Sequence, residues 1–458
     1  MHMSRRILQA LAIAICLLSS CGGDGKEDIP DPKDEPKSKS DYPDPGVEKN
    51  PLVDYTKWSI HDGKFYLDGK WKFLKIAKPL TITSNPPEAQ EIIDELDDMA
   101  RYHYNTVEIC CSWDWYDTDG DGHLDKSVEP LRKVVDAVYA KGMYPCINLG
   151  NYSVGGNGVP EGFWSSHGDE VYAVDRNGKL VTDTEYGFGS KVVSLFNEDY
   201  LKASRQYIKE IAEALDLNKV LYVETTVEPQ YMGAIALDYS ENARKAYNEW
   251  RTRNGITDPS SEMPETFPIP DSFVQNKTWN RFRAQYLAEW VNGDAAAWRS
   301  VAGKNAYVAV DYLETDGGEM YLRNGDSEEF LRNLTCANII QVNWHWKFTT
   351  GSPNQAAYDH VYKIMRETGR DWAVSEHMTF NGSDYGFAES TLDRILENTL
   401  CNGTRFGWEF TNYRYSTKDN FTLYDSQGKP KRVMRAVDDY WGYWLHRIEE
   451  IENQKSGS

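Results

Sequence analysis

Two glutamates stand where short apolar stretches of the chain end. Residues 221–232 begin with β-forming side chains and run into a Glu-Pro-Gln-Tyr turn that presents Glu228. Residues 371–380 place Glu376 after a similar apolar run. Two carboxyl groups delivered by two strand ends are the minimum that hydrolysis of a glycosidic bond requires, so this chemistry is the first to consider.

Strand and helix patterns alternate around these two stretches. Such alternation favours a parallel sheet with crossover helices, and eight strands is the number that closes a (β/α)8 TIM barrel. An open doubly wound sheet is the alternative, but a Gly-rich phosphate loop after the first strand is absent. The expected strands are 72–77, 106–111, 144–149, 220–225, 306–311, 338–343, 372–375 and 404–410. The expected helices are 89–102, 130–141, 200–215, 279–301, 327–335, 355–368, 390–402 and 431–453, with an extra helix at 240–253.

The barrel gives the two glutamates a specific place. Catalytic residues of this fold lie at the C-terminal ends of the strands. Glu228 follows the fourth expected strand, and Glu376 follows the seventh. Glu224 could compete with Glu228, but it lies inside the strand and points either into the barrel or toward the helices.

Short motifs around the fourth strand resemble known glycosidases. Val-Glu-Pro at 227–229 resembles the Asn-Glu-Pro of family 5 glycoside hydrolases, and 238–240, 246–250, 253–255 and 279–282 resemble the segment after the acid/base in family 42 β-galactosidases. The resemblance covers roughly residues 72–450. It implies a retaining hydrolase of β-glycosidic bonds, with Glu228 as acid/base and Glu376 as nucleophile.

One position departs from that pattern. The clan usually has Asn immediately before the acid/base, and this chain has Val227. Either another side chain contacts the sugar, or the sugar differs at its 2-position, or the barrel hydrolyses nothing. The last possibility describes a non-catalytic surface glycan-binding lipoprotein on a decayed barrel, which is the alternative function.

Aromatic and polar residues near the strand ends are candidates for binding sugar. Trp faces stack on pyranose rings, while Asn and His bind hydroxyl groups. Packing in the core is the competing interpretation for each aromatic residue. Trp408 resembles the clan's strand-eight Trp, which floors the catalytic subsite. The candidates for substrate binding are Trp113, Tyr231, Asn343, Trp344, His345 and Trp408.

An acidic stretch after the second strand has the spacing of a calcium loop. Asp117, Asp119, Asp121 and Asp125 occupy positions 1, 3, 5 and 9 of an EF-hand loop, with Gly122 at position 6. Position 12 is Val128 rather than Glu. We expect either a structural calcium ion or an acidic, solvated turn, and no cofactor for catalysis.

The N-terminus has the pattern of a targeting segment. Arginines and an apolar run precede Leu18-Ser-Ser-Cys21, which resembles a bacterial lipobox with Cys21 lipidated. The acidic residues that follow resemble the surface-export signal of Bacteroidetes outer-membrane lipoproteins. The expected organisation is a signal peptide (1–20), a disordered tether (21–54), an N-terminal hairpin (55–72) and the barrel (73–453).

Charge and composition limit the partners. The net charge of −21, from 71 acidic and 50 basic residues, argues against nucleic acid and anionic membrane surfaces as partners. A neutral ligand such as a glycan is unaffected by that field. We expect a monomer that binds carbohydrate and meets the membrane only through its lipid anchor.

Overall fold

The computed structural model describes most of the chain beyond the N-terminal segment. The described residues are 38–46, 50–79, 83–149, 158–182, 191–231, 237–312, 324–343, 355–378, 389–411, 424 and 432–456. Within these residues, no helix combines the length and the apolar character needed to cross a membrane.

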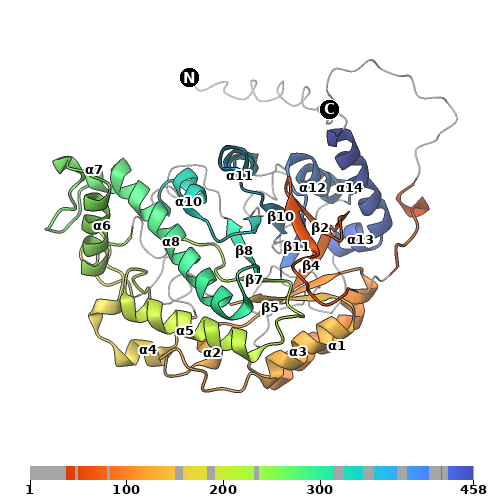
Figure 1. Cartoon of the computed structure of the whole chain (residues 1–458), viewed down its shortest axis with the longest axis horizontal. Helices are drawn as coiled ribbons and strands as arrows, with labels where there is room; N and C mark the ends of the chain where they lie inside the picture. The colour runs from red at the N-terminus through yellow and green to blue at the C-terminus, as the bar shows by residue number, and fades with distance from the viewer. Residues whose placement is uncertain are drawn as a thin grey trace, which may run out of the picture.

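Eight parallel strands close into a barrel, as the sequence predicts (Figure 1). Each strand pairs with its neighbours in chain order, and the last pairs with the first: Gly407 of β11 lies opposite Leu74 of β4. The barrel strands are β4 (Leu74–Lys78), β5 (Thr106–Cys110), β6 (Tyr144–Asn148), β7 (Tyr222–Glu224), β8 (Tyr307–Tyr312), β9 (Ile339–Asn343), β10 (Ala373–Met378) and β11 (Gly407–Thr411).

Helices surround the barrel and cover its outer face (Figure 1). Their apolar residues recur every three or four positions, as in α1, where Ala89, Ile92, Leu96 and Met99 are buried. The main helices are α1 (Pro86–Arg101), α3 (Glu129–Ala140), α5 (Glu198–Ala214), α6 (Glu241–Arg253), α8 (Lys277–Ala302), α10 (Ser327–Asn333), α11 (Gln355–Thr368), α12 (Glu389–Asn402), α13 (Arg432–Asp438) and α14 (Trp441–Ser456). Short helices are α2 (Trp113–Tyr116), α4 (Glu161–Ser166) and α7 (Asp271–Val274), with 3-10 turns η1 (Lys39–Asp41), η2 (Asp169–Val171) and η3 (Pro259–Ser261).

The expected last helix, 431–453, is in fact two helices. A turn at Asp439 and Tyr440 separates α13 from α14. Asp438, at the end of α13, pairs with Lys75 of β4 beneath the helix layer. This buried contact fixes the end of α13 against the barrel.

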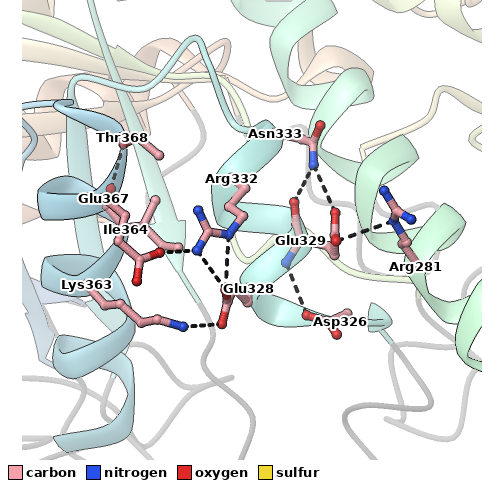
Figure 2. A network of polar contacts seen from close by, with 10 residues as sticks. All are labelled: Arg281, Asp326, Glu328, Glu329, Arg332, Asn333, Lys363, Ile364, Glu367 and Thr368. Carbon is pink, nitrogen blue, oxygen red and sulfur yellow. Dashed lines mark hydrogen bonds and ion pairs between the residues drawn. The ribbon is translucent and has the colours of Figure 1, made fainter.

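Exposed ion pairs join three of the outer helices (Figure 2). Glu328 of α10 pairs with Lys363 of α11 at 2.6 Å and with Arg332 of its own helix at 2.8 Å. Arg281 of α8 lies 3.3 Å from Glu329. Such surface pairs contribute little to stability, so packing on the barrel rather than charge holds these helices.

The predicted N-terminal hairpin is a three-stranded antiparallel sheet of β1 (Trp58–His61), β2 (Lys64–Leu67) and β3 (Lys70–Trp71). Positive φ angles at Asp62 and Gly63 suit the tight turn between β1 and β2. The ring of Phe65 lies 5.1 Å from those of Tyr307 and Phe406, residues at the N-terminal ends of barrel strands. The small sheet therefore covers the bottom of the barrel with apolar side chains.

The end of the expected disordered tether, which the sequence placed at 21–54, is packed against the barrel. Tyr42 lies 5.5 Å from the ring of Tyr443 on α14, and the Val53 amide donates to the Asn218 carbonyl at 2.7 Å. Tyr42 and Val53 are apolar residues within a polar stretch, and their packing explains why this part of the tether is ordered. The signal peptide, Cys21 and the tether up to residue 37 lie outside the described residues.

Candidate active site

A layer of polar side chains fills the C-terminal half of the barrel. Alternate strands supply it: Glu108 from β5, Glu224 from β7, Gln341 from β9 and Glu409 from β11, each with no solvent exposure. Alternate strands also supply the layers of other TIM barrels, but bulky aliphatic side chains usually fill them. We call these four residues the glutamate layer. Buried carboxyl groups lower the stability of the fold unless they are paired with other polar groups. Because a barrel can be filled with apolar side chains instead, a layer of carboxyl groups is a candidate for function.

Lys78, at the end of β4, pairs with all three glutamates of the layer. Its Nζ lies 2.8 Å from Glu108 Oε1, 3.0 Å from Glu224 Oε2 and 3.3 Å from Glu409 Oε1. One cation therefore joins carboxylates from three strands.

Neutral groups also donate hydrogen bonds to the layer. The Asn148 amide of β6 donates to Glu108 at 2.9 Å and also to Glu224. The Tyr222 hydroxyl donates to the second oxygen of Glu108 at 2.9 Å. Glu108 thus accepts bonds on both oxygens, which favours its ionised form.

The environment drives the pKa values of the layer apart. Burial raises the pKa of Glu108, but Lys78 and the hydrogen bonds outweigh it and hold that pKa well below the usual range. Burial and the adjacent Glu108 raise the pKa of Glu224 well above its usual value. Burial lowers the pKa of Lys78, but the glutamates outweigh it and raise that pKa. The layer thus pairs an ionised carboxylate with a carboxyl group that keeps its proton, the combination that acid–base chemistry uses.

Glu228 lies just beyond the C-terminal end of the fourth barrel strand, where the sequence places it. It is half-buried, four residues after the last residue of β7, and its backbone has φ of +44°. The Gln230 amide donates to Glu228 Oε2 at 3.4 Å. A left-handed glutamate is uncommon, and such backbone strain gathers at functional sites. Val227 beside it is also half-buried.

The side chain of Glu376 does not point into the barrel, as the predicted nucleophile should. It is fully buried in β10, opposite Val342 and Trp408, and it accepts a hydrogen bond from the Tyr358 hydroxyl of α11. Its carboxylate therefore faces the helix layer, because Ala373 and Ser375 occupy the inward positions of the strand. As placed, it is on the opposite side of the sheet from the barrel interior, at odds with the expected role.

Three aromatic residues predicted to bind sugar pack in the core instead. Trp408 Nε1 donates to Thr399 Oγ1 of α12 at 2.9 Å, on the helix side of β11. Trp113 Nε1 donates to Asp117 at 2.7 Å, and the Tyr231 hydroxyl donates to the Arg283 carbonyl at 3.0 Å. All three are almost or completely buried, which fits the core-packing interpretation. Asn343 ends β9, but its side chain is outside the described part of the chain, as are Trp344 and His345.

The sequence interpretation missed Lys78, Glu108, Asn148 and Glu409. Lys78 directly follows an expected strand and the other three lie inside expected strands, so the strands themselves were recognised. The available signal was a charged residue between β-formers, as in Thr-Val-Glu-Ile-Cys at 106–110. Such a residue on the inward face of a barrel strand has no access to water and must meet another polar group.

The predicted calcium loop brings three of its four carboxylates together. Ligand oxygens of Asp117, Asp119 and Asp125 lie within 4.8 Å of one another. Asp117 is buried and accepts from the amides of Gly120 at 2.7 Å and Gly122 at 2.8 Å. Asp121 is not part of this group; it accepts from the His123 amide. The donor set is all oxygen, which suits a hard cation such as calcium.

The fold is similar to those of several solved structures. The first is the catalytic domain of a β-amylase from Paenibacillus polymyxa, at 14% identity and a TM-score of 0.58, covering 83% of this chain and 98% of that one. A second is the β-galactosidase from the psychrophilic Marinomonas ef1, at 10% identity and a TM-score of 0.58, covering 84% and 60%. A third is a cold-adapted β-galactosidase from Rahnella sp. R3, at 12% identity and a TM-score of 0.59, covering 88% and 58%.

Similarity at these identities establishes the architecture alone. The chain spans nearly all of the β-amylase domain but less than two thirds of either β-galactosidase. No protein-family model and no curated protein sequence matches the chain. The comparisons therefore confirm the predicted (β/α)8 barrel.

Proposed function

We propose that this protein is a glycoside hydrolase that cleaves β-glycosidic bonds of an oligosaccharide or polysaccharide with retention. The observation that carries the proposal is the carboxyl-rich interior of the barrel, with Glu228 just beyond the end of the fourth strand. Two further points support it. The family 42-like motifs follow Glu228 in the chain, and the three similar structures bear the names of glycosidases.

Glu228 is the proposed acid/base. In a retaining reaction it protonates the leaving oxygen as that oxygen separates from the anomeric carbon, while a second, ionised carboxylate attacks the same carbon. Water, deprotonated by Glu228, then breaks the new ester bond and releases the sugar. Because Glu376 faces α11 and Glu224 keeps its proton, we assign the second carboxylate to another inward-facing glutamate, with Glu108 and Glu409 as the candidates.

Isosteric variants test the catalytic assignment. Glu228→Gln should lower kcat by about 10²–10⁴-fold, because general acid catalysis contributes that much. Glu108→Gln and Glu409→Gln, compared with Glu376→Gln, identify the second carboxylate, and a 2-deoxy-2-fluoroglycoside followed by peptide mass spectrometry locates the covalent ester. Full activity of Glu228→Gln on every glycoside that the wild type cleaves would refute the assignment.

A non-catalytic glycan-binding protein is the second candidate. Val227 in place of Asn and the outward-facing Glu376 favour it. Isothermal titration with oligosaccharides, alongside an assay for reducing sugar, separates the two functions. Tight binding without turnover or labelling would establish the second; turnover excludes it.

We also propose a structural calcium ion at Asp117, Asp119 and Asp125, where it would stabilise the loop after β5. Calcium should raise the melting temperature, and Asp119→Asn should remove most of this gain. Asp121→Asn, outside the group, is the matched control. A melting temperature that neither calcium nor a chelator changes would refute the site.

The expected membrane attachment through Cys21 stays a proposal. Radiolabelled palmitate should enter the wild type in a bacterial host but not Cys21→Ala, and protease treatment of whole cells should report surface exposure. Equal labelling of both proteins would contradict lipidation at Cys21. Sedimentation of the purified domain tests the expected monomer.

A further inference from the structure

Two described residues that follow Glu228 in the chain contact helix α8. Tyr231 is 3% exposed, and Leu237, at the next described position along the chain, is 1% exposed. Both residues contact Arg283 of α8, which itself has no solvent exposure. One arginine therefore meets the chain on both sides of residues 232–236.

Arg283 makes two side-chain hydrogen bonds and one ring contact with described residues. Its Nε donates to the Leu237 carbonyl at 2.6 Å, and its Nη1 donates to Asn280 Oδ1 at 2.8 Å. The guanidinium lies 4.8 Å from the centre of the Tyr231 ring, while the Tyr231 hydroxyl donates to the Arg283 carbonyl. These directions are set by a planar group, so lysine cannot reproduce them.

The helix end that holds Arg283 is itself fixed. Asn280 is fully buried and donates to the carbonyls of Val274 at 2.9 Å and Asn276 at 3.0 Å. Phe196 stacks on Tyr231, with ring centres 6.2 Å apart. The guanidinium is thus a fixed point for the segment rather than a group that adapts to it.

Burying an arginine is costly, and apolar side chains often fill such space with no loss of stability. A buried guanidinium is therefore better explained by a conformation that it specifies. The neighbouring conformation that needs support is that of Glu228, whose backbone is left-handed, a conformation that costs free energy in any residue other than glycine.

We propose that Arg283 is a positioning residue for Glu228. By holding Tyr231 and Leu237, it fixes the direction in which the chain leaves β7 and so the place of the Glu228 carboxyl. The inference rests on the proposed function of Glu228 as acid/base.

Helix α8 offers a matched control at its other end. Arg299 is half-buried and donates to the carbonyls of Ala306 at 3.0 Å and Cys336 at 2.8 Å, and to Asn338 Oδ1 at 2.7 Å. These residues precede β8 and β9, at the bottom of the barrel. The two arginines share a helix and a contact type, but only Arg283 contacts the segment after Glu228.

The test compares Arg283→Lys with Arg299→Lys in the full chain. Both should lower the melting temperature. Arg283→Lys should also lower kcat by about 10²-fold with little change in KM, because a displacement of about 1 Å can cost that much, and it should shift the limb of the pH–rate profile assigned to Glu228. Tyr231→Phe, which loses one hydrogen bond, should give a smaller effect in the same direction.

The outcomes separate the inference from the proposed function. Equal kcat and pH profiles in Arg283→Lys and Arg299→Lys, with Glu228→Gln inactive, would overturn the positioning role and leave the hydrolase assignment intact. An inactive wild type would refute the hydrolase and the positioning role with it. A wild type and Glu228→Gln that are equally active would show that Glu228 has no role for Arg283 to support.

Discussion

Strand β4 buries two lysines, and they meet opposite environments. Lys75 points out of the barrel toward α13, where it pairs with Asp438 and donates to the Tyr102 carbonyl at 2.7 Å. Lys78 points into the barrel and meets three glutamates. Burial lowers the pKa of Lys75 and raises that of Asp438 to about 6, whereas the pKa of Lys78 rises.

The difference distinguishes a structural ion pair from a site. Around Lys75, one cation meets one carboxylate, with the rings of Tyr104 and Trp441 within 5 Å of its ammonium. Apolar groups of the same volume could fill that space. Around Lys78, carboxyl groups outnumber the cation, so the cluster keeps a proton on Glu224 that packing alone does not need. We expect an excess of buried carboxyl groups at a site that carries out chemistry, not at a contact that only stabilises the fold.

The largest expected effect comes from removing the inner cation. Lys78→Met leaves the glutamate layer without a countercharge and should cost about 3–5 kcal/mol of unfolding free energy at pH 7. The cost should shrink toward pH 5, because the glutamates can then take up protons. Urea denaturation at both pH values measures it. A cost below that of Lys75→Met would reverse the comparison.

The outer pair should behave as a replaceable unit. Lys75→Met alone leaves Asp438 buried without its cation and should cost somewhat less, about 3 kcal/mol, because Asp438 can be protonated. The double variant Lys75→Met/Asp438→Leu should regain most of that loss. A double-mutant cycle from urea denaturation checks this. Failure of the double variant to recover would mean that the outer pair, too, has a role beyond closing the helix layer.

The sequence predicts where the barrel strands lie, but it does not predict which side chains of a strand point into the barrel. All eight barrel strands follow from apolar β-forming runs, and Glu228 from a turn that ends one of them. The orientations of Glu376 and Trp408 did not follow, because one residue of register moves a side chain from the inside of the barrel to the outside. Glu376 of β10 lies opposite Trp408 of β11, so one strand register sets the orientation of both side chains.

The glutamate layer was hidden for another reason. Its members come from β5, β7, β9 and β11, far apart in the sequence, and only closure of the barrel brings them to Lys78. Strand patterns indicate on which face of its strand each side chain lies. They do not indicate which residue of another strand it contacts inside the barrel. The predicted calcium loop, in contrast, is local, and three of its four predicted carboxylates do lie together.

A smaller effect is expected from the proton on Glu224. Its pKa is higher in the folded protein than in the unfolded chain, so between these values the folded state binds more protons and stability falls as pH rises. The contribution is about 1.4 kcal/mol per pH unit within that window. Glu224→Gln should remove this slope, measured as unfolding free energy from pH 5 to pH 8. An unchanged slope would place the proton elsewhere in the layer.

The smallest effect is expected where charges are exposed. Glu367→Gln on α11 removes the partner of Arg332 in the surface network of Figure 2. Water already solvates both groups, so the midpoint of urea unfolding should not move measurably, and pH should not change that result. A shift as large as that of Lys78→Met would mean that the number of charges, rather than their burial inside the barrel, controls stability, and the contrast between the two lysines would lose its physical basis.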